Sequence, residues 1–490
     1  MDWTALADFN GDGKLDIAFT GRGEAIGTLS VLLNEGGGTF SAPTVFQLTS
    51  GGAFLLAGDF NGDGSSDLVT SAGAHLFARD DGILLFEGGP SSVYVIFNSC
   101  PAAARWPPSV QFGAPSFDAL ESDGVAQVTV TRSGNLSGET TVDYFTSDGT
   151  ASQVSDYTTA LGRLRFAPNE ASKTLRIIVT DDAFVEPSET FVVSLANPSG
   201  GVPGAHASAT VTIKDTDTSQ GPNPITQEAG NAAFFVRQHY ADFLGREPDA
   251  EGLQFWTNEI TSCGADPVCT EVKRINVSAA FFLSIEFQNT GYLVERMYKV
   301  AYGDATDPST GLQVPVIRRS EFLADTPLIS SGVIVGQGDW QTTLANNKAA
   351  YTLTFVQRQR FTDIYGGLSP TDFVARLDAN AGGVLSQAEQ ESLVNELATA
   401  TDPVAARASV VRKVAENAEL DRREKNRAFV LMGYFGYLRR NPNDAPEKDL
   451  NYAGWKFWLD KLNEFNGDYV RAEMVKAFLD SIEYRQRFGQ

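Results

Sequence analysis

Hydrophobic and polar positions follow two different periods along the chain. Before about residue 215, apolar side chains alternate with polar ones over short segments, as at Leu175, Ile177 and Val179. Alternation of this kind predicts half-buried β-strands. From residue 231 onward the apolar spacing becomes three and four, which predicts amphipathic helices. The chain is therefore expected to be multidomain, with a β region followed by an all-α region.

A nine-residue motif occurs twice near the N-terminus, at residues 8–16 and 59–67. The two copies are Asp-Phe-Asn-Gly-Asp-Gly-Lys-Leu-Asp and Asp-Phe-Asn-Gly-Asp-Gly-Ser-Ser-Asp, and each leads into a short apolar segment typical of a strand. Their offset of 51 residues is close to the length of a β-propeller blade. Residues 1–98 are therefore expected to form two partial propeller blades.

The motif has the chemistry of a calcium loop. Side-chain oxygens at positions 1, 3, 5 and 9, with the carbonyl at position 7, can surround one Ca²⁺, and glycine at position 6 permits the sharp turn. An EF-hand would need Glu at position 12, where Phe19 and Thr70 stand. The alternative is an Asp/Gly-rich turn without metal. The expected ligands are Asp8, Asn10, Asp12, Lys14 (by its carbonyl) and Asp16, and then Asp59, Asn61, Asp63, Ser65 (by its carbonyl) and Asp67.

These loops resemble the FG-GAP/VCBS repeats of integrin-type β-propellers. The resemblance covers about residues 1–98 and implies a Ca²⁺ loop between strands. A closed propeller usually has about seven blades, and this segment supplies two. Either further blades precede this segment, or the two blades stack on another part of the protein.

The middle segment, residues 110–217, has the pattern of an antiparallel, immunoglobulin-like β-sandwich. Six or seven short apolar-alternating segments are separated by turn sequences such as Asp148-Gly149 and Pro168-Asn169. Its acidic residues gather at predicted strand ends, where mutual repulsion favours a bound cation.

Several pieces of this segment resemble a Calx-β domain. They are Glu121 with Asp123-Gly124, Ser155-Asp156-Tyr157, the run 181–186, Glu189-Thr190-Phe191 and the closing Lys214-Asp215-Thr216-Asp217. The resemblance implies that calcium is held at one end of the sandwich. Glu189 is a weaker candidate ligand, for which the alternative is a side chain that only faces solvent. The alternative for the whole set is an acidic edge that binds calcium loosely or not at all. The implied ligands are Glu121, Asp156, Asp181, Asp182, Glu186, Asp215 and Asp217.

A linker over 218–230 leads into helical repeats over 231–490. The segment Tyr-Ala-Asp-Phe-Leu-Gly-Arg-Glu-Pro at 240–248 returns as Tyr-Phe-Gly-Tyr-Leu-Arg-Arg-Asn-Pro at 434–442. Copies are therefore expected near 231–300 and 425–490, with a degenerate copy near 355–420. These copies resemble the bacterial "domain of unknown function 4214" family, which implies a scaffold or interaction role near the end of an exported protein. Repeated helical units must bury their apolar faces on each other.

Composition and charge narrow the function. Residues 1–230 carry 27 acidic and 10 basic side chains, a net charge of −17, against −6 for the remainder. Such a surface repels nucleic acid and suits divalent cations. No run of 18 apolar residues predicts a membrane span. Met1-Asp2-Trp3 leads directly into a folded motif, so the signal sequence of a secreted or cell-surface protein is expected to be missing from this fragment.

The chain has three cysteines. Cys263 and Cys269 flank a turn and are expected to form a disulfide, which suits an exported protein; the alternative is two separate thiols. Three scattered histidines offer no zinc-ligand spacing.

The sequence contains none of the common catalytic motifs for a nucleophile elbow, a zinc protease or a phosphate loop. The expected function is a non-catalytic, calcium-binding scaffold or adhesion protein, stiffened by Ca²⁺ and facing a protein or glycan at the cell surface. The alternative is a carbohydrate-binding accessory region of a larger secreted hydrolase.

Overall fold

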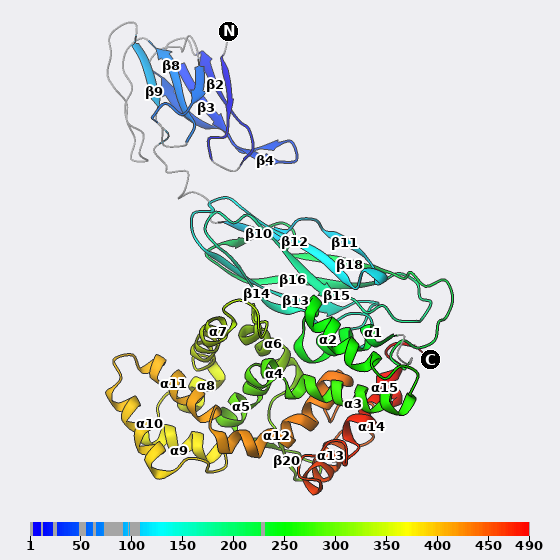
Figure 1. Cartoon of the computed structure of the whole chain (residues 1–490). Helices are drawn as coiled ribbons and strands as arrows, with labels where there is room; N and C mark the ends of the chain where they lie inside the picture. The colour runs from blue at the N-terminus through cyan, green and yellow to red at the C-terminus, as the bar shows by residue number, and fades with distance from the viewer. Residues whose placement is uncertain are drawn as a thin grey trace.

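The computed structural model has three parts in chain order: two small sheets, a β-sandwich and a helical region (Figure 1). It describes residues 3–10, 13–22, 27–48, 55–61, 65–72, 92–96, 98, 108–226 and 231–489. The order of a β region before an α region is therefore as the hydrophobic periods predict.

The described N-terminal part consists of a small β4–β5 hairpin and two larger antiparallel sheets, with strand orders β1–β2–β3–β6 and β7–β8–β9. Both contribute to one apolar cluster, which joins Ala18 and Leu29 of the first sheet to Leu55 and Leu68 of the second. In each sheet the last Asp of the repeated motif opens a strand. The strands are β1 (Thr4–Ala7), β2 (Asp16–Arg22), β3 (Gly27–Leu32), β4 (Asn34–Gly36), β5 (Thr39–Phe40), β6 (Thr44–Leu48), β7 (Leu55–Gly58), β8 (Asp67–Ala72) and β9 (Ser92–Ile96).

The sandwich consists of two sheets, ordered β15–β12–β10–β17 and β11–β18–β16–β13–β14. Alternate residues of both sheets face inward, and Phe112, Phe166 and Phe191 lie fully buried between them. The strands are β10 (Ser109–Phe112), β11 (Ser116–Leu120), β12 (Val125–Ser133), β13 (Thr140–Asp148), β14 (Leu161–Phe166), β15 (Ser172–Ile178), β16 (Glu189–Ser199), β17 (Val202–Pro203) and β18 (Ser208–Lys214).

Two strand pairs depart from the expected antiparallel arrangement, because β10 pairs with β17 and β11 with β18 in parallel. Strands β10 and β11 belong to opposite sheets although only residues 113–115 separate them. Pro115 has no N–H to donate to a ladder, so the chain leaves the first sheet here and enters the second. The strand crossing brings the end of β11 beside the end of β18.

The helical region folds around one continuous apolar core. Within the described residues no helix is both long and apolar enough to span a bilayer. Its elements are α1 (Ala232–His239), η3 (Tyr240–Leu244), α2 (Ala250–Thr261), α3 (Pro267–Leu283), α4 (Ile285–Asn289), α5 (Gly291–Tyr302), β19 (Asp304–Thr306), β20 (Gln313–Pro315), α6 (Arg319–Ser330), α7 (Trp340–Phe355), α8 (Gln359–Tyr365), α9 (Pro370–Asn380), α10 (Gln387–Thr399), α11 (Pro403–Ala415), α12 (Ala418–Met432), η4 (Gly433–Tyr437), α13 (Ala453–Glu464), α14 (Met474–Asp480) and α15 (Ile482–Arg485).

Corresponding residues make corresponding contacts in the first and last helical repeats. Arg246 pairs with Glu286 at 2.7 Å, and Arg440 pairs with Glu483 at 2.6 Å. Each arginine also lies over the ring of the tyrosine six residues earlier, at 4.9 Å and 5.2 Å. In both repeats the first helix widens into a π-turn, at η3 and η4. These are two copies of one structural unit.

The two copies pack against each other through these π-turns. The rings of Phe243 and Tyr437 lie 5.0 Å apart, edge to face, and the Tyr437 hydroxyl is hydrogen-bonded to Ser278. Gly436 allows the close approach, since a Cβ at this position would lie 3.0 Å from the Phe243 ring. Each copy thus buries an apolar face on the other, as helical repeats require.

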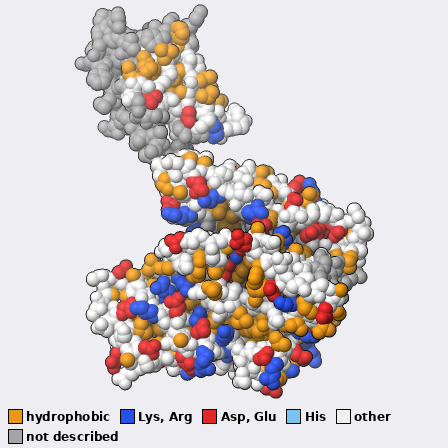
Figure 2. All heavy atoms as spheres, in the orientation of Figure 1, with side chains coloured by type: hydrophobic (Ala, Val, Ile, Leu, Met, Phe, Trp, Pro, Cys, Tyr) orange, Lys and Arg blue, Asp and Glu red, His pale blue; other side chains and the backbone are white. Residues whose placement is uncertain are grey.

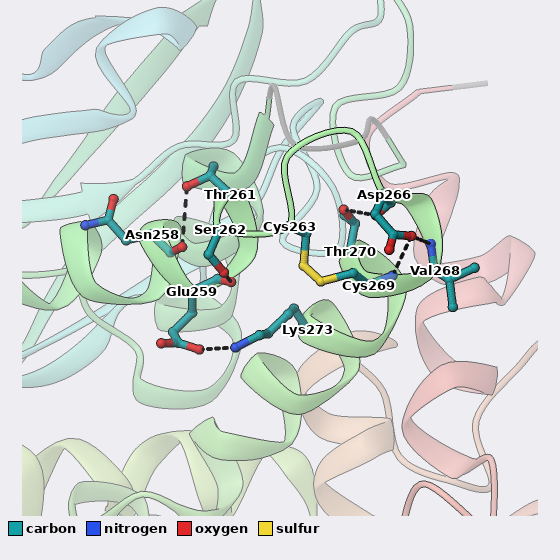
Figure 3. The surroundings of a disulfide bond; sticks show 10 residues. All are labelled: Asn258, Glu259, Thr261, Ser262, Cys263, Asp266, Val268, Cys269, Thr270 and Lys273. Atoms are coloured by element: carbon teal, nitrogen blue, oxygen red, sulfur yellow. Dashed lines mark hydrogen bonds and ion pairs between the residues drawn. A yellow bond between two sulfur atoms is a disulfide. The ribbon is translucent and has the colours of Figure 1, made fainter.

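A disulfide joins Cys263 to Cys269 across the turn between α2 and α3 (Figure 3). Asp266 caps α3 by accepting hydrogen bonds from the N–H groups of Val268 and Cys269. The turn between α13 and α14 is built in the same way, because Asp468 accepts from the N–H groups two and three residues later.

In that second turn, Phe465 and Arg471 occupy the positions that correspond to the two cysteines. The guanidinium of Arg471 lies 5.0 Å from the centre of the Phe465 ring, so a cation–π contact stands where the first copy has its disulfide. The same backbone turn therefore forms with and without a covalent bond.

We expect the double variant C263S/C269S to keep the helical fold. Loss of a short cross-link removes about 2 kcal/mol of stability through the entropy of the unfolded chain, which lowers the melting temperature by about 5 °C in a domain of this size. Circular dichroism and calorimetry would measure both. A collapse of helical content would show that the turn depends on the disulfide, contrary to the second copy.

Candidate metal centre

Acidic residues from four segments meet at one end of the sandwich. Glu121 lies in a short 3₁₀ turn directly after β11, and Asp156 lies in the loop 149–160 between β13 and β14. The loop 179–188, between β15 and β16, carries three more acids, and a further two follow β18. Figure 2 shows acidic side chains at this right-hand end of the sandwich. The predicted ligands of the sandwich, which are distant in sequence, are thus close in space.

The tightest group is formed by Asp156, Glu186 and Glu189, whose carboxylate oxygens lie within 4.8 Å of one another. Glu189, the weaker candidate, thus lies beside two of the other acids. The alternation of side chains along β16 indicates this position from the sequence. Glu189 is two residues before the fully buried Phe191 and therefore lies on the same face of the strand.

Backbone N–H groups hold several of these carboxylates in place. Asp182 donates its N–H to Glu121 Oε1 at 2.6 Å, which ties the loop 179–188 to the turn after β11. Asp215 accepts from the N–H groups of Glu186 at 2.7 Å and Asp217 at 2.6 Å. The bonds from Asp182 and Glu186 join the loop 179–188 to the turn after β11 and to the segment after β18, so these acidic segments form one connected unit.

Burial and mutual repulsion act together on the acids. Burial, followed by the charges of neighbouring Asp residues, raises the pKa of Glu121 to about 8. Burial and nearby carboxylates likewise raise the pKa of Asp182 to about 7 and that of Glu189 to about 8. The charges that shift these groups most are other carboxylates, so the loops lack positive charge of their own.

This donor set suits calcium. Ca²⁺ takes six to eight oxygen ligands and favours carboxylates. Asp217 Oδ2 is buried and has no hydrogen-bond partner among the described residues, which leaves a desolvated oxygen free for a cation. The acids present therefore fit a hard divalent cation, which would neutralise the charges that raise the pKa values.

In the N-terminal loops, the last Asp of each motif accepts hydrogen bonds from backbone N–H groups. Asp16 is fully buried, and its two oxygens accept the N–H groups of Phe9 at 2.9 Å and Asn34 at 2.7 Å. Asp67 repeats this arrangement in the second loop, with the same two distances, from Phe60 and Asn98.

Each carboxylate thus joins its loop to the backbone that follows a neighbouring strand, at Asn34 after β3 and at Asn98 after β9. Asp8 Oδ2 accepts from Gly13 N at 2.7 Å, while the predicted ligands Asp12 and Asp63 lie outside the described residues. The remaining predicted ligands of these loops, Asn10, Lys14, Asp59, Asn61 and Ser65, are within the described residues.

The same three regions match known families. Residues 105–217 match the Calx-beta domain. Residues 8–70 match the FG-GAP-like repeat, and residues 226–291 match a domain of unknown function, DUF4214. The three resemblances inferred from sequence motifs are confirmed.

Two curated relatives match a portion of the chain about as long as the sandwich. Extracellular matrix protein 3 of Lytechinus variegatus is 33% identical over 132 residues, which is 26% of this chain and 4% of that protein. The sodium/calcium exchanger Calx of Drosophila melanogaster is 38% identical over 112 residues, 23% of this chain and 12% of the exchanger. This chain therefore spans only a small part of these relatives.

Among solved structures, the apo-form CBD1 domain of Calx is 37% identical, and the match covers 22% of this chain and 98% of that domain, with a TM-score of 0.22. The calcium-binding domain pair CBD12 of CALX1.1 matches with the same identity and score, over 46% of its length.

We predict that stability without metal depends on pH in a direction set by the raised pKa values. Folding raises the pKa of Glu121 from 4.5 to about 8 and that of Asp182 from 3.8 to about 7. The folded protein therefore holds protons more tightly than the unfolded chain, and its stability falls as the pH rises through this range. In chelator, the melting temperature of the sandwich transition is expected to be lower at pH 8 than at pH 5. Saturating calcium should abolish or reverse this order, and equal pH dependence in both buffers would contradict the assignment.

In the N-terminal loops we expect some Asp residues to stabilise the fold with or without calcium and others to do so only when calcium is bound. Asp16→Asn replaces an acceptor of two backbone N–H groups, so it should lower the melting temperature with and without calcium, by an amount equivalent to about 1–3 kcal/mol. Asp12→Asn should lower it in calcium alone. Calorimetry in both conditions separates them, and identical behaviour of the two variants would show that both positions act in the same way.

Proposed function

We propose that this chain is part of a secreted or cell-surface scaffold, non-catalytic, in which Ca²⁺ bound at the acidic end of the sandwich stiffens the β modules. The observation that carries the proposal is the convergence of many carboxylates without compensating positive charge. The proposed ligands are Glu121, Asp156, Asp181, Asp182, Glu186, Glu189, Asp215 and Asp217.

The comparisons support this proposal from two sides. The sodium/calcium exchanger Calx of Drosophila melanogaster is 38% identical to this chain over 112 residues, about the length of the sandwich. Extracellular matrix proteins, including the organizing protein FRAS1 of Mus musculus at 34% identity over 113 residues, resemble the same region. A sandwich of this family thus occurs both in calcium-linked and in matrix proteins.

The N-terminal loops would add further calcium sites of the FG-GAP type, which fits the net charge of −17 over residues 1–230. The helical region supplies the interaction surface for a protein or glycan at the surface of a bacterial cell. Its tight core and its internal duplication suit a rigid support more than a flexible linker.

One observation favours the alternative of a carbohydrate-binding accessory region. Phe255 and Phe457 occupy corresponding positions in the two copies and are 57% and 52% exposed. Each ring meets the neighbouring tryptophan edge to face, at 4.9 Å in both copies. Exposed aromatic rings can stack on sugars, but one ring in each copy is a smaller platform than a row of rings.

Glu186→Gln tests the proposed calcium site with opposite effects in two conditions. Removing one charge relieves repulsion, so the variant should melt at a higher temperature than the parent in chelator. Losing a ligand should weaken calcium binding to the sandwich about tenfold or more. Isothermal calorimetry and melting curves measure both effects on the full chain.

Glu139→Gln is the matched control, since Glu139 lies on the same sandwich but pairs with Arg165 on an exposed surface. It should leave the calcium affinity unchanged. Equal calcium affinity of Glu186→Gln and parent would remove Glu186 from the site. Absence of any saturable calcium binding in the folded parent would defeat the proposed function.

A further inference from the structure

The helical region touches the sandwich at the loop that carries Asp156. Arg439 donates to the carbonyl oxygens of Gln153 at 2.7 Å and Tyr157 at 2.8 Å, and to the hydroxyl of Thr158 at 2.9 Å. These three residues surround Asp156 in sequence. The position of a proposed calcium ligand is therefore fixed from both sides by one arginine of the helical region.

A second arginine holds the same loop, and a second loop is held by the chain end. Arg487 donates to the carbonyl oxygen of Val154 at 2.9 Å. Ala183, which lies between Asp182 and Phe184 in the loop 179–188, donates its N–H to the Phe488 carbonyl at 3.1 Å. The two loops, which supply four of the eight proposed ligands, thus rest on the second helical copy.

The two arginines share one buried counter-charge. Arg439 and Arg487 pair with Asp242 at 3.0 Å and 2.9 Å, and all three side chains are at most 2% exposed. Burial would raise the pKa of Asp242, but Arg487 and Arg439 outweigh it and hold this pKa below its ordinary value. We call Asp242, Arg439 and Arg487 the arginine cluster. It is built from both copies, since Asp242 belongs to the first and the arginines to the second.

The arginine cluster occupies positions at which the two copies differ. Arg439 corresponds to Gly245, and both adopt a left-handed backbone, with φ of 51° and 62°. Glycine accepts this conformation freely, whereas an arginine there is strained by roughly 1 kcal/mol or more. Asp242 corresponds to Gly436, and Arg487 to Thr290. The second copy thus keeps a strained arginine where its own repeat pattern offers glycine, and that arginine contacts the sandwich.

We propose that calcium binding by the sandwich and docking of the helical region on it are coupled through the arginine cluster. The inference rests on the proposed calcium function. The helical region orders the loops 149–160 and 179–188 before the ion arrives, so part of the ordering cost of binding is already met. By reciprocity, bound calcium strengthens the docking of the helical region by the same factor.

Arg439→Gly is the decisive variant, because it restores the residue that the first copy has and relieves the left-handed strain. The calcium concentration at half-maximal protection of residues 152–158 would be followed by hydrogen exchange on the full chain. We expect this midpoint to rise about fivefold or more in the variant. In the parent, calcium should also slow exchange over residues 484–489 of the helical region, and this effect should be lost in the variant.

Two further variants keep the test decisive. Glu473→Gly removes another left-handed residue, with φ of 54°, on the exposed surface, and should leave the midpoint unchanged. Arg319→Gln removes the contact of Arg319 with the Gln153 side chain, 2.9 Å, while all three members of the arginine cluster stay in place, and should raise the midpoint by a smaller factor.

Unchanged midpoints in both Arg439→Gly and Arg319→Gln, with calcium protection confined to the sandwich, would overturn the coupling while leaving the proposed function intact. No calcium protection of residues 152–158 in the parent at millimolar calcium would overturn the proposed function and the coupling with it.

Discussion

Repulsion among carboxylates held together at one end of the sandwich is the constraint on which the middle of this chain depends. The strand crossing at residues 113–115 brings the ends of β11 and β18 together, and β16 adds Glu189 from its first position. Backbone N–H groups, such as that of Asp182 toward Glu121, stabilise part of the charge. They are dipoles and not cations, so they leave the net charge of the loops unchanged. The oxygen donors gathered here are of the kind that a hard divalent cation takes.

The helical region contacts the acidic loops of the sandwich from outside the acidic group. Its arginine cluster donates to backbone carbonyls and to one hydroxyl of the Asp156 loop, and the charge of the cluster is shared with Asp242. Its contribution is geometric. It fixes the path of the loops and leaves their carboxylates directed toward each other. A rigid helical support and a charge-dense loop end are therefore complementary parts of one assembly, in which order in one part lowers the entropy cost of order in the other.

Internal duplication explains how such a support arises from a small unit. The two copies share the pairs Arg246–Glu286 and Arg440–Glu483, which fix their loops in the same way. These shared contacts stabilise the fold of both copies. The contacts to the sandwich lie at positions where the two copies differ, as at Arg439. The disulfide of the first copy and the cation–π pair of the second show the same division between a shared turn and a local variation.

The sequence by itself determined the local structure and the chemistry. Periods of two and of three to four separate the β region from the α region, and spacing within the repeated nine-residue motif indicates calcium loops, because these signals depend on neighbours in the chain. The tertiary structure alone decided which distant residues meet. Contacts between segments far apart in sequence decide the parallel pairing of β11 with β18, the two backbone N–H groups at Asp16 and the contact of Arg439 with the Asp156 loop. No local pattern encodes such contacts in a single chain.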